Sequence, residues 1–174
     1  MRNRLLKGLL YLIGLFAALL GILFIYLLIV TRVDPPRPAS MESLGWQRKK
    51  LDSGLYSIKN NWLRKSESGL YELYIEGNPF ERGVIIGKLT KELAHYQEQV
   101  FVKQLHQIVP SDFKINLLKV FVGWFNRDLE KNIPEEFKLE ILGVSTQASV
   151  DYDYIAPPYQ RMINYHAAHD IGHA

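Results

Sequence analysis

The stretch GLYELYIEGNPFERGVIIGKLTKELAHYQEQVFVKQLHQIV, residues 69–109, decides the predicted fold because its hydrophobic period changes partway along. Residues 70–75 are rich in Leu, Tyr and Ile, which is typical of a strand. The preceding apolar pair, Trp62 and Leu63, stands before a run of turn-forming residues and is a suitable partner. The first part of the stretch therefore predicts a β-hairpin.

The second part of the stretch predicts one long helix. Asn78 suits the N-cap, and Pro79 suits the first helical position, where its missing N–H costs nothing. Steps of three to five residues then keep one face apolar up to Pro110, where the helix is expected to end. The residues of that face are Val84, Leu89, Leu93, Tyr96, Val100, Leu105 and Ile108.

Two glycines stand one turn apart inside this helix, Gly83 and Gly87. Each costs roughly 1 kcal/mol of helix propensity relative to Ala, which indicates a close approach of another backbone. A phosphate-binding loop is the alternative, but the spacing of Gly77, Gly83 and Gly87 matches neither the P-loop nor the dinucleotide motif. We therefore interpret the glycines as packing residues.

The sequence of the remaining body predicts an α+β domain of two or three strands followed by three or four helices. Residues 55–58 predict the first strand. A further helix is expected after Ser111 or Asp112, facing the same core, with later helices from Pro134 and from about Tyr159. The apolar positions of the helix after Ser111 are Ile115, Leu118, Phe121, Val122, Phe125 and Leu129.

The N-terminal part of the chain predicts a membrane anchor. Residues 8–30 carry no charge, and a helix of that length covers roughly 35 Å, enough for a hydrocarbon core of roughly 30 Å. A cleaved signal peptide has a shorter apolar core. We therefore expect an uncleaved single-pass helix whose partner is the lipid bilayer.

Flanking charges predict the sidedness of this anchor. Arg2, Arg4 and Lys7 precede it, whereas the residues that follow carry both signs. This bias favours a cytoplasmic N-terminus and an extracytoplasmic body, which in a bacterium is an inner-membrane protein facing the periplasm. The expected organisation is 1–31 for the cytoplasmic tip and anchor, 32–54 for a Pro-rich spacer and lead-in, and 55–174 for the domain.

Composition excludes several kinds of chemistry. The 174 residues include no cysteine, so they supply no disulfide, no thiolate zinc site and no cysteine nucleophile. The formal charge is only +3. The basic run Arg48–Lys50 is interpreted as a solvated loop, and no nucleic-acid partner is expected.

A cluster of polar residues near residue 174 is the one candidate metal site. His166, His169, Asp170 and His173 can share a broad helix face, and imidazoles with a carboxylate can hold a metal. The run departs from the HExxH arrangement because the Glu between the histidines is missing, and Gly172 weakens the helix. We favour a hydrogen-bond network in which Asp170 fixes a histidine tautomer.

A serine-based site is disfavoured. Ser145 and Ser149 have histidines and aspartates after them, but no Gly-x-Ser-x-Gly elbow surrounds either serine. No catalytic residue and no cofactor are assigned.

Five short motifs stand in order at residues 61–64, 69–83, 87–89, 133–136 and 140–143. Taken together, they resemble the acyl-CoA:6-aminopenicillanate acyltransferase-like family of N-terminal-nucleophile hydrolases. Residues 169–173 also resemble the segment that leads toward the nucleophile in membrane-anchored bacterial members. The resemblance covers the soluble part of the chain and the N-terminal portion of the family's domain.

The resemblance implies an αββα sandwich in which a cysteine, freed as a new N-terminus by self-cleavage, attacks an amide or ester carbonyl. Its own α-amino group would serve as the base. Because this chain has no cysteine, no catalytic residue transfers to it. We expect the front part of a longer domain, inactive alone, whose partner is the remainder of that domain and whose sheet has one bare face.

Three hypotheses for the function remain open at this point. The first is the membrane-anchored front part of an acyltransferase or amidohydrolase. The second is a non-catalytic, membrane-tethered extracytoplasmic module for binding or assembly. The third is a metal-dependent hydrolase that uses the terminal His/Asp cluster.

Overall fold

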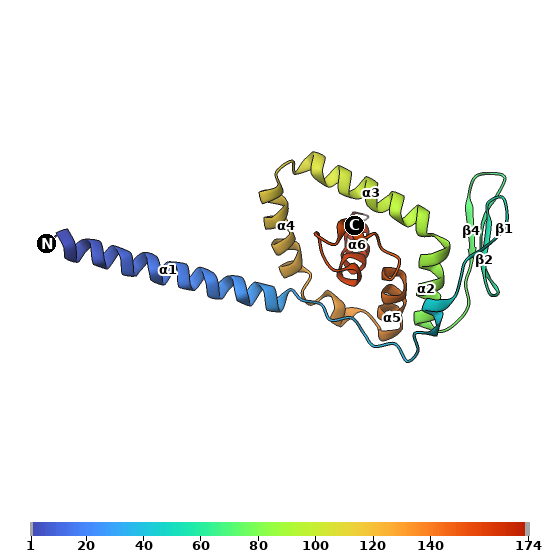
Figure 1. The fold of residues 1–174 in the computed structure, drawn as a ribbon, viewed down its shortest axis with the longest axis horizontal. Coiled ribbons are helices and arrows are strands. Elements are labelled where there is room, and N and C mark those ends of the chain that lie inside the picture. Colours follow the sequence, from blue (N-terminus) through green and yellow to red (C-terminus); the bar gives the residue numbers. More distant parts are fainter. Residues whose placement is uncertain (1, 173–174) are drawn as a thin grey trace.

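The computed structural model describes the backbone of residues 2–172 and most of their side chains, and the fold is α+β (Figure 1). The helices are α1 (Arg2–Val30), α2 (Pro79–Leu89), α3 (Lys91–Ile108), α4 (Asp112–Phe125), α5 (Glu135–Ser145) and α6 (Pro158–Gly172). The strands are β1 (Lys49–Asp52), β2 (Leu55–Ile58), β3 (Asn61–Lys65) and β4 (Tyr71–Tyr74). Three short 3-10 helices are η1 (Glu42–Gly45), η2 (Leu129–Asn132) and η3 (Val150–Tyr152).

The strands form one antiparallel sheet in the order β1-β2-β3-β4. The predicted hairpin is confirmed as β3 and β4, with Trp62 opposite Tyr74. The predicted strand at residues 55–58 is confirmed as β2, but it is not the first strand, because β1 precedes it. The sheet of the described residues has four strands where two or three were expected. β1 is an exposed edge strand of mostly charged residues, so it lacks the apolar signal of a buried strand.

The single long helix predicted from residue 79 to residue 109 is two helices. Asn78 does cap α2, with its side chain accepting from the Glu81 N–H in a capping box. The helix then breaks at Thr90, whose backbone has φ −101° and ψ 10° and whose hydroxyl donates to the Ile86 carbonyl. This break brings the number of helices after the hairpin to five, where three or four were expected.

The break also changes which face of α3 points inward. Tyr96 and Ile108, predicted on the buried face, are 68% and 79% exposed. Glu98 and Val102 are buried instead. The apolar spacing continues through Thr90 and so gives no sign of the change of direction there.

The body is layered in the order sheet, α2, α5 and α6. One sheet face packs on α2 through a core of Ile58, Leu63, Ile85 and Leu89, each at most 4% exposed. The other side of α2 packs on α5, which in turn contacts α6 (Figure 1). The helices therefore cover one face of the sheet only.

Helix α4 lies at the edge of these layers, and the prediction that it faces the same core is wrong. Of its predicted core positions, Ile115 is buried, whereas Phe121 and Phe125 are exposed. Near its C-terminal end, α4 contacts the end of α1.

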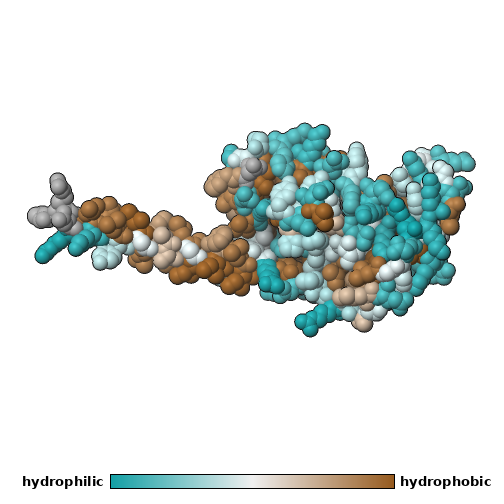
Figure 2. All heavy atoms as spheres, viewed as in Figure 1, coloured by the Kyte–Doolittle hydropathy of each residue, from teal (hydrophilic) through white to brown (hydrophobic). Residues whose placement is uncertain are grey.

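Helix α1 projects from the body (Figures 1 and 2). Its segment Leu6–Val30 is long and apolar enough to cross a membrane, and none of that segment is buried against the body. A soluble helix with this composition would hide at least one face.

Candidate functional site

The contact between α2 and α5 is close enough that only glycine fits at its centre. A Cβ on Gly83 would lie 2.0 Å from the Glu140 carbonyl oxygen and 2.9 Å from the Gly143 Cα. A Cβ on Gly143 would lie 2.5 Å from the Phe80 carbonyl oxygen. The prediction that Gly83 marks a close approach is confirmed, and the approaching backbone is that of a neighbouring helix.

An ion pair fastens the same contact. The Arg82 guanidinium donates from Nε and Nη2 to Glu140 Oε2, at 3.0 Å and 2.8 Å, and Nη1 donates to the Gly77 carbonyl at 3.2 Å. Both side chains are about two-thirds shielded from solvent, which strengthens the pair relative to an exposed one. The ion pair therefore connects the turn before α2 to the middle of α5.

The sheet is tied to the start of α2 by Asn61, which is 3% exposed. Its Oδ1 accepts from the Glu76 N–H at 2.5 Å, and its Nδ2 donates to the Ile58 carbonyl at 3.3 Å. Hydrogen bonds from Asn60 and Tyr74 lower the pKa of the exposed Glu76 carboxyl. These bonds fix the angle at which the chain leaves β4.

The C-terminal end of α2 is held by two cations. Lys88 Nζ donates to the carbonyls of Leu44 and Trp46 at 2.6 Å and 2.5 Å, and burial lowers the pKa of Lys88. Arg48 donates to the Leu89 carbonyl at 3.5 Å and makes two bonds to the Glu92 carboxylate. The interpretation of Arg48–Lys50 as a solvated loop is therefore wrong, because Arg48 bonds to α2 and α3, and Lys49 and Lys50, although exposed, lie in strand β1.

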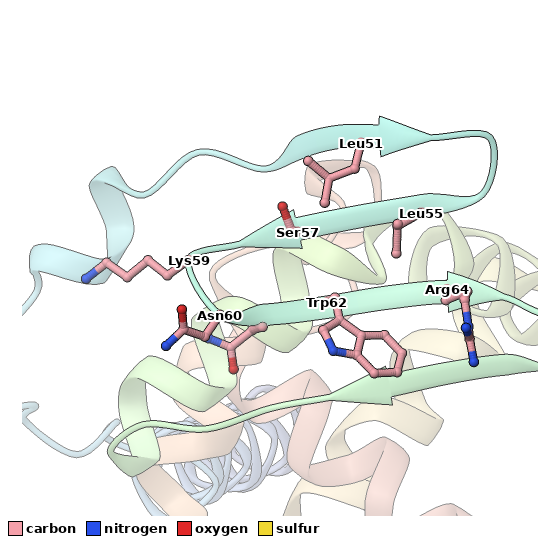
Figure 3. A pocket seen from close by; sticks show the side chains of 8 residues that line it. Leu51, Leu55, Ser57, Lys59, Asn60, Trp62 and Arg64 are labelled. Atoms are coloured by element: carbon pink, nitrogen blue, oxygen red, sulfur yellow. The ribbon is translucent and has the colours of Figure 1, made fainter.

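The sheet face opposite α2 is open to solvent and forms a trough of about 380 Å³ (Figure 3). Trp62 at its centre stacks on Tyr74, with ring centroids 6.2 Å apart. The Arg64 guanidinium lies 5.6 Å from the Trp62 ring and is paired with Glu72. The lining residues are Leu51, Leu55, Ser57, Lys59, Asn60, Asn61, Trp62 and Arg64.

The side chains of this open face are suited to packing against another molecule and not to catalysis. Its apolar members, such as Leu51 at 60% exposed and Tyr74 at 45% exposed, can pack on another surface. The lining residues include one hydroxyl, that of Ser57, and neither a histidine nor a carboxylate that could activate it. We take the open face as the candidate functional site, in the sense of a docking surface.

A second polar cluster is buried between α3 and α6. Arg161 Nε lies 2.9 Å from Glu98 Oε1, and the two side chains are 1% and 4% exposed. The contact is an ion pair and not a hydrogen bond, because the Nε–H has no well-aligned acceptor in the described residues. Replacing one partner of such a pair leaves a buried charge and costs about 3–5 kcal/mol.

Further bonds satisfy this ion pair. Arg161 donates to Asp153 at 3.0 Å and to the Ser149 carbonyl at 2.6 Å. The Tyr165 hydroxyl donates to Glu98 at 3.0 Å, and burial together with the Glu98 charge raises the pKa of Tyr165. The network holds α3, α6 and the turn after α5 together, so we assign it a structural role.

Sequence reasoning missed the Glu98–Arg161 pair. Glu98 lies one turn before Val102, the buried apolar residue of α3, so a charge on that face was the available signal. Its partner lies on another helix, and spacing along one helix carries no information about it.

Ser145 and Ser149, the two serines weighed as candidate nucleophiles, make local hydrogen bonds that stabilise the fold. Ser145 Oγ donates to the Leu142 carbonyl of its own helix at 2.8 Å. Ser149 Oγ donates to Asp151 at 3.2 Å and accepts from the Asp151 N–H. His95 Nε2 donates to the Gln147 carbonyl at 2.7 Å, so this nitrogen is occupied.

The terminal metal candidate falls largely outside the described residues. The His166 side chain is exposed on α6, while the side chains of His169 and Asp170, and the whole of His173, are not described. Elsewhere, the part of the chain with described side chains contains no group of three or more His, Asp or Glu able to hold a metal. The candidate therefore stays a prediction.

Comparison with known proteins adds no relative. A scan against protein-family models, a search of curated proteins and a search of solved structures each found no match.

Proposed function

We propose that the chain is the membrane-anchored scaffold part of an acyltransferase or amidohydrolase of the N-terminal-nucleophile type. In this proposal, the open sheet face receives the second sheet of an αββα sandwich. The cysteine that attacks the acyl carbon is carried by the polypeptide that completes the domain.

The observation that carries the proposal is the one-sided sheet. Its inner face is covered by α2, and its outer face exposes Leu51 and Tyr74 around the trough. Sheets of a sandwich pack face to face about 10 Å apart through such side chains. One helix layer and one sheet are half of an αββα sandwich, and the outer face is the surface on which the other half would pack.

The packing of the motif segments also supports the proposal. Motif residues that are far apart in sequence are in contact, namely Gly83 with Gly143 and Arg82 with Glu140. Asn61, which begins another motif segment, bonds to the residue before Gly77. The matched segments therefore form one packed unit.

The composition of the chain determines which part of the proposed reaction it can supply. The thiol of an N-terminal cysteine attacks the acyl carbonyl while its α-amino group takes the thiol proton and passes it to the leaving amine or thiol. The acyl group bound to the cysteine is then transferred to an amine or to water. The 174 residues contain no cysteine, so the attacking atom comes from elsewhere. This chain contributes the scaffold and the anchor α1, with the body outside the cytoplasmic membrane.

The test is to express the chain together with the DNA that follows its gene, and to isolate it through a tag on this chain. We expect a β-rich polypeptide that begins with cysteine to co-purify and to be acylated by an acyl-thioester probe. Leu51→Glu on the open face should weaken co-purification, whereas Val150→Glu, equally polar and at a site 78% exposed, should not.

Two results would contradict the proposal. One is a completing polypeptide without an N-terminal cysteine, which would favour the non-catalytic assembly module. The other is a Leu51→Glu variant that binds its partner as well as the parent chain.

A further inference from the structure

Helix α4 carries an apolar stripe that the body does not cover. Its members recur at steps of three and four residues, so they share one helix face. The opposite face packs inward through Ile115, which is 4% exposed, and Gly123. The exposed members are Phe113 at 77%, Leu117 at 61%, Phe121 at 59%, Trp124 at 37% and Phe125 at 60%.

The C-terminal part of α4 lies beside the end of α1, with Gly123 on the face opposite the stripe in contact with Thr31. A Cβ on Gly123 would lie 3.1 Å from Thr31 Cβ, and Gln160 Nε2 donates to the Thr31 carbonyl at 3.0 Å. The apolar segment Leu6–Val30 has 25 residues, which span roughly 37 Å and cross a core of roughly 30 Å. Thr31 therefore falls at the membrane surface, and α4 lies at the same level.

The direction of α4 suits a helix that rests on a membrane. Figure 1 shows α4 running across the direction of α1, at the side of the body from which α1 projects. Figure 2 shows hydrophobic atoms gathered on that side of the body, next to α1. Helix α4 therefore lies on the side of the body that would face the bilayer crossed by α1.

The charges around α4 favour a lipid surface over a protein core. Residues 112–131, counted from the start of α4, contain four basic and three acidic residues. The Arg127 guanidinium lies 4.4 Å from the Trp124 ring centroid, and Lys114 is exposed. Acidic Asp128 is already paired with Lys131. Tryptophan rings and basic side chains are enriched where protein meets lipid headgroups.

We propose that α4 is an interfacial helix that lies in the headgroup region of the bilayer crossed by α1, with Phe113, Leu117 and Phe121 inserted into the acyl boundary. The inference rests on the anchor in the proposed function and is independent of the acyl-transfer chemistry. It gives the body a second attachment, which fixes its orientation and directs the open sheet face away from the membrane.

The test uses three spin-labelled variants of the full chain in anionic phospholipid nanodiscs. Because the sequence contains no cysteine, each introduced cysteine is the only labelling site. Leu117→Cys probes α4, Leu15→Cys probes α1, and Leu51→Cys probes the far sheet. The three leucines are 61%, 61% and 60% exposed, so the labels differ in position and not in burial.

The readout is the accessibility of each nitroxide to oxygen relative to a water-soluble nickel complex. We expect this ratio to be several-fold higher for Leu117→Cys and Leu15→Cys than for Leu51→Cys. A lipid-exposed Leu15 label with a water-exposed Leu117 label would overturn the inference and leave the anchor intact. A Leu117 label shielded from both reagents would mean that protein covers α4, which also overturns it.

Tryptophan quenching gives an independent check without labels. The variant Trp46→Phe with Trp62→Phe keeps Trp124, and the variant Trp46→Phe with Trp124→Phe keeps Trp62 on the far sheet. Brominated lipids should quench Trp124 several-fold more than Trp62. Equal quenching of the two would contradict the inference, and failure of the Leu15 label to enter lipid would remove the anchor on which it rests.

Discussion

Helices α2 and α4 are amphipathic in sequence, yet they have opposite surroundings. In α2, Phe80, Val84 and Leu89 are at most 4% exposed, between the sheet and α5. In α4, Phe113 and Leu117 are 77% and 61% exposed beside the end of α1. Hydrophobic period therefore indicates that a helix has an apolar face, but it does not indicate what covers that face.

The difference between the two faces is visible in the residues that accompany them. The face of α2 contains Gly83 and Gly87, which allow another backbone to come within contact distance. The stripe of α4 combines large aromatic rings with nearby cations. Small residues indicate a protein neighbour, whereas aromatic and basic residues together indicate a lipid surface.

The largest expected effect comes from the same substitution on the two helices. Phe80→Ala should lower the free energy of unfolding by about 3–5 kcal/mol, because it removes a buried ring and leaves a cavity. Phe113→Ala should change it by less than about 0.5 kcal/mol, because Phe113 is exposed. Chemical denaturation of the detergent-solubilised chain, followed by tryptophan fluorescence, measures both. Equal losses from the two substitutions would contradict the difference in burial between Phe80 and Phe113.

The close contact of α2 is tested by adding one methyl group. Gly83→Ala should cost about 2–4 kcal/mol, because overpacking against the α5 backbone outweighs the roughly 1 kcal/mol gain in helix propensity. Gly45→Ala is the control, since a Cβ there meets no atom within 4 Å. The same denaturation assay applies. A Gly83→Ala variant as stable as the parent would show that the two backbones lie farther apart than described.

The starts of the two helices give a smaller contrast. Asn78→Ala should cost about 1 kcal/mol, because the N-cap side chain bonds to the Glu81 N–H. Ser111, at the N-cap of α4, makes no side-chain cap hydrogen bond, so Ser111→Ala should cost less. A greater loss at Ser111 than at Asn78 in the denaturation assay would contradict the difference in capping.

The smallest effect concerns the surface pair that joins Arg48 to the first turn of α3. The hydrogen bond from Arg48 lowers the pKa of Glu92 below its usual 4.5, so the pair stabilises the fold above that pH and loses this contribution as pH falls through the folded pKa. Glu92→Gln should lower the free energy of unfolding by about 0.2–1 kcal/mol at pH 7. Between pH 7 and pH 3, the free energy of unfolding should then fall less than it does in the parent chain. Denaturation at both pH values checks this, and an unchanged pH slope would be inconsistent with the pairing.

Local signals in the sequence predicted a substantial part of the fold. The β3–β4 hairpin, the Asn78 cap and the close approach at Gly83 each follow from neighbouring residues, and the structure confirms them. The edge strand β1 was missed because paired charged residues lack an apolar alternation. The break at Thr90 was missed because the apolar spacing continues across it.

Less of the candidate site than of the fold could be predicted from the sequence. That one sheet face would be bare followed from the small number of strands, but the trough around Trp62 depends on the register of three strands. The Glu98–Arg161 pair joins two helices through tertiary packing, and the α4 stripe was assigned to the core. Long-range contacts of this kind are not encoded in any local period.

The most direct test of the central claim is an acyl-transfer assay on this chain alone. The chain is purified in nanodiscs and incubated with fluorogenic acyl-amide and acyl-thioester substrates. We expect no turnover above the buffer rate and no covalent acyl adduct by mass spectrometry, because the 174 residues contain no cysteine to accept the acyl group. Sustained turnover by the purified chain without a second polypeptide would contradict it.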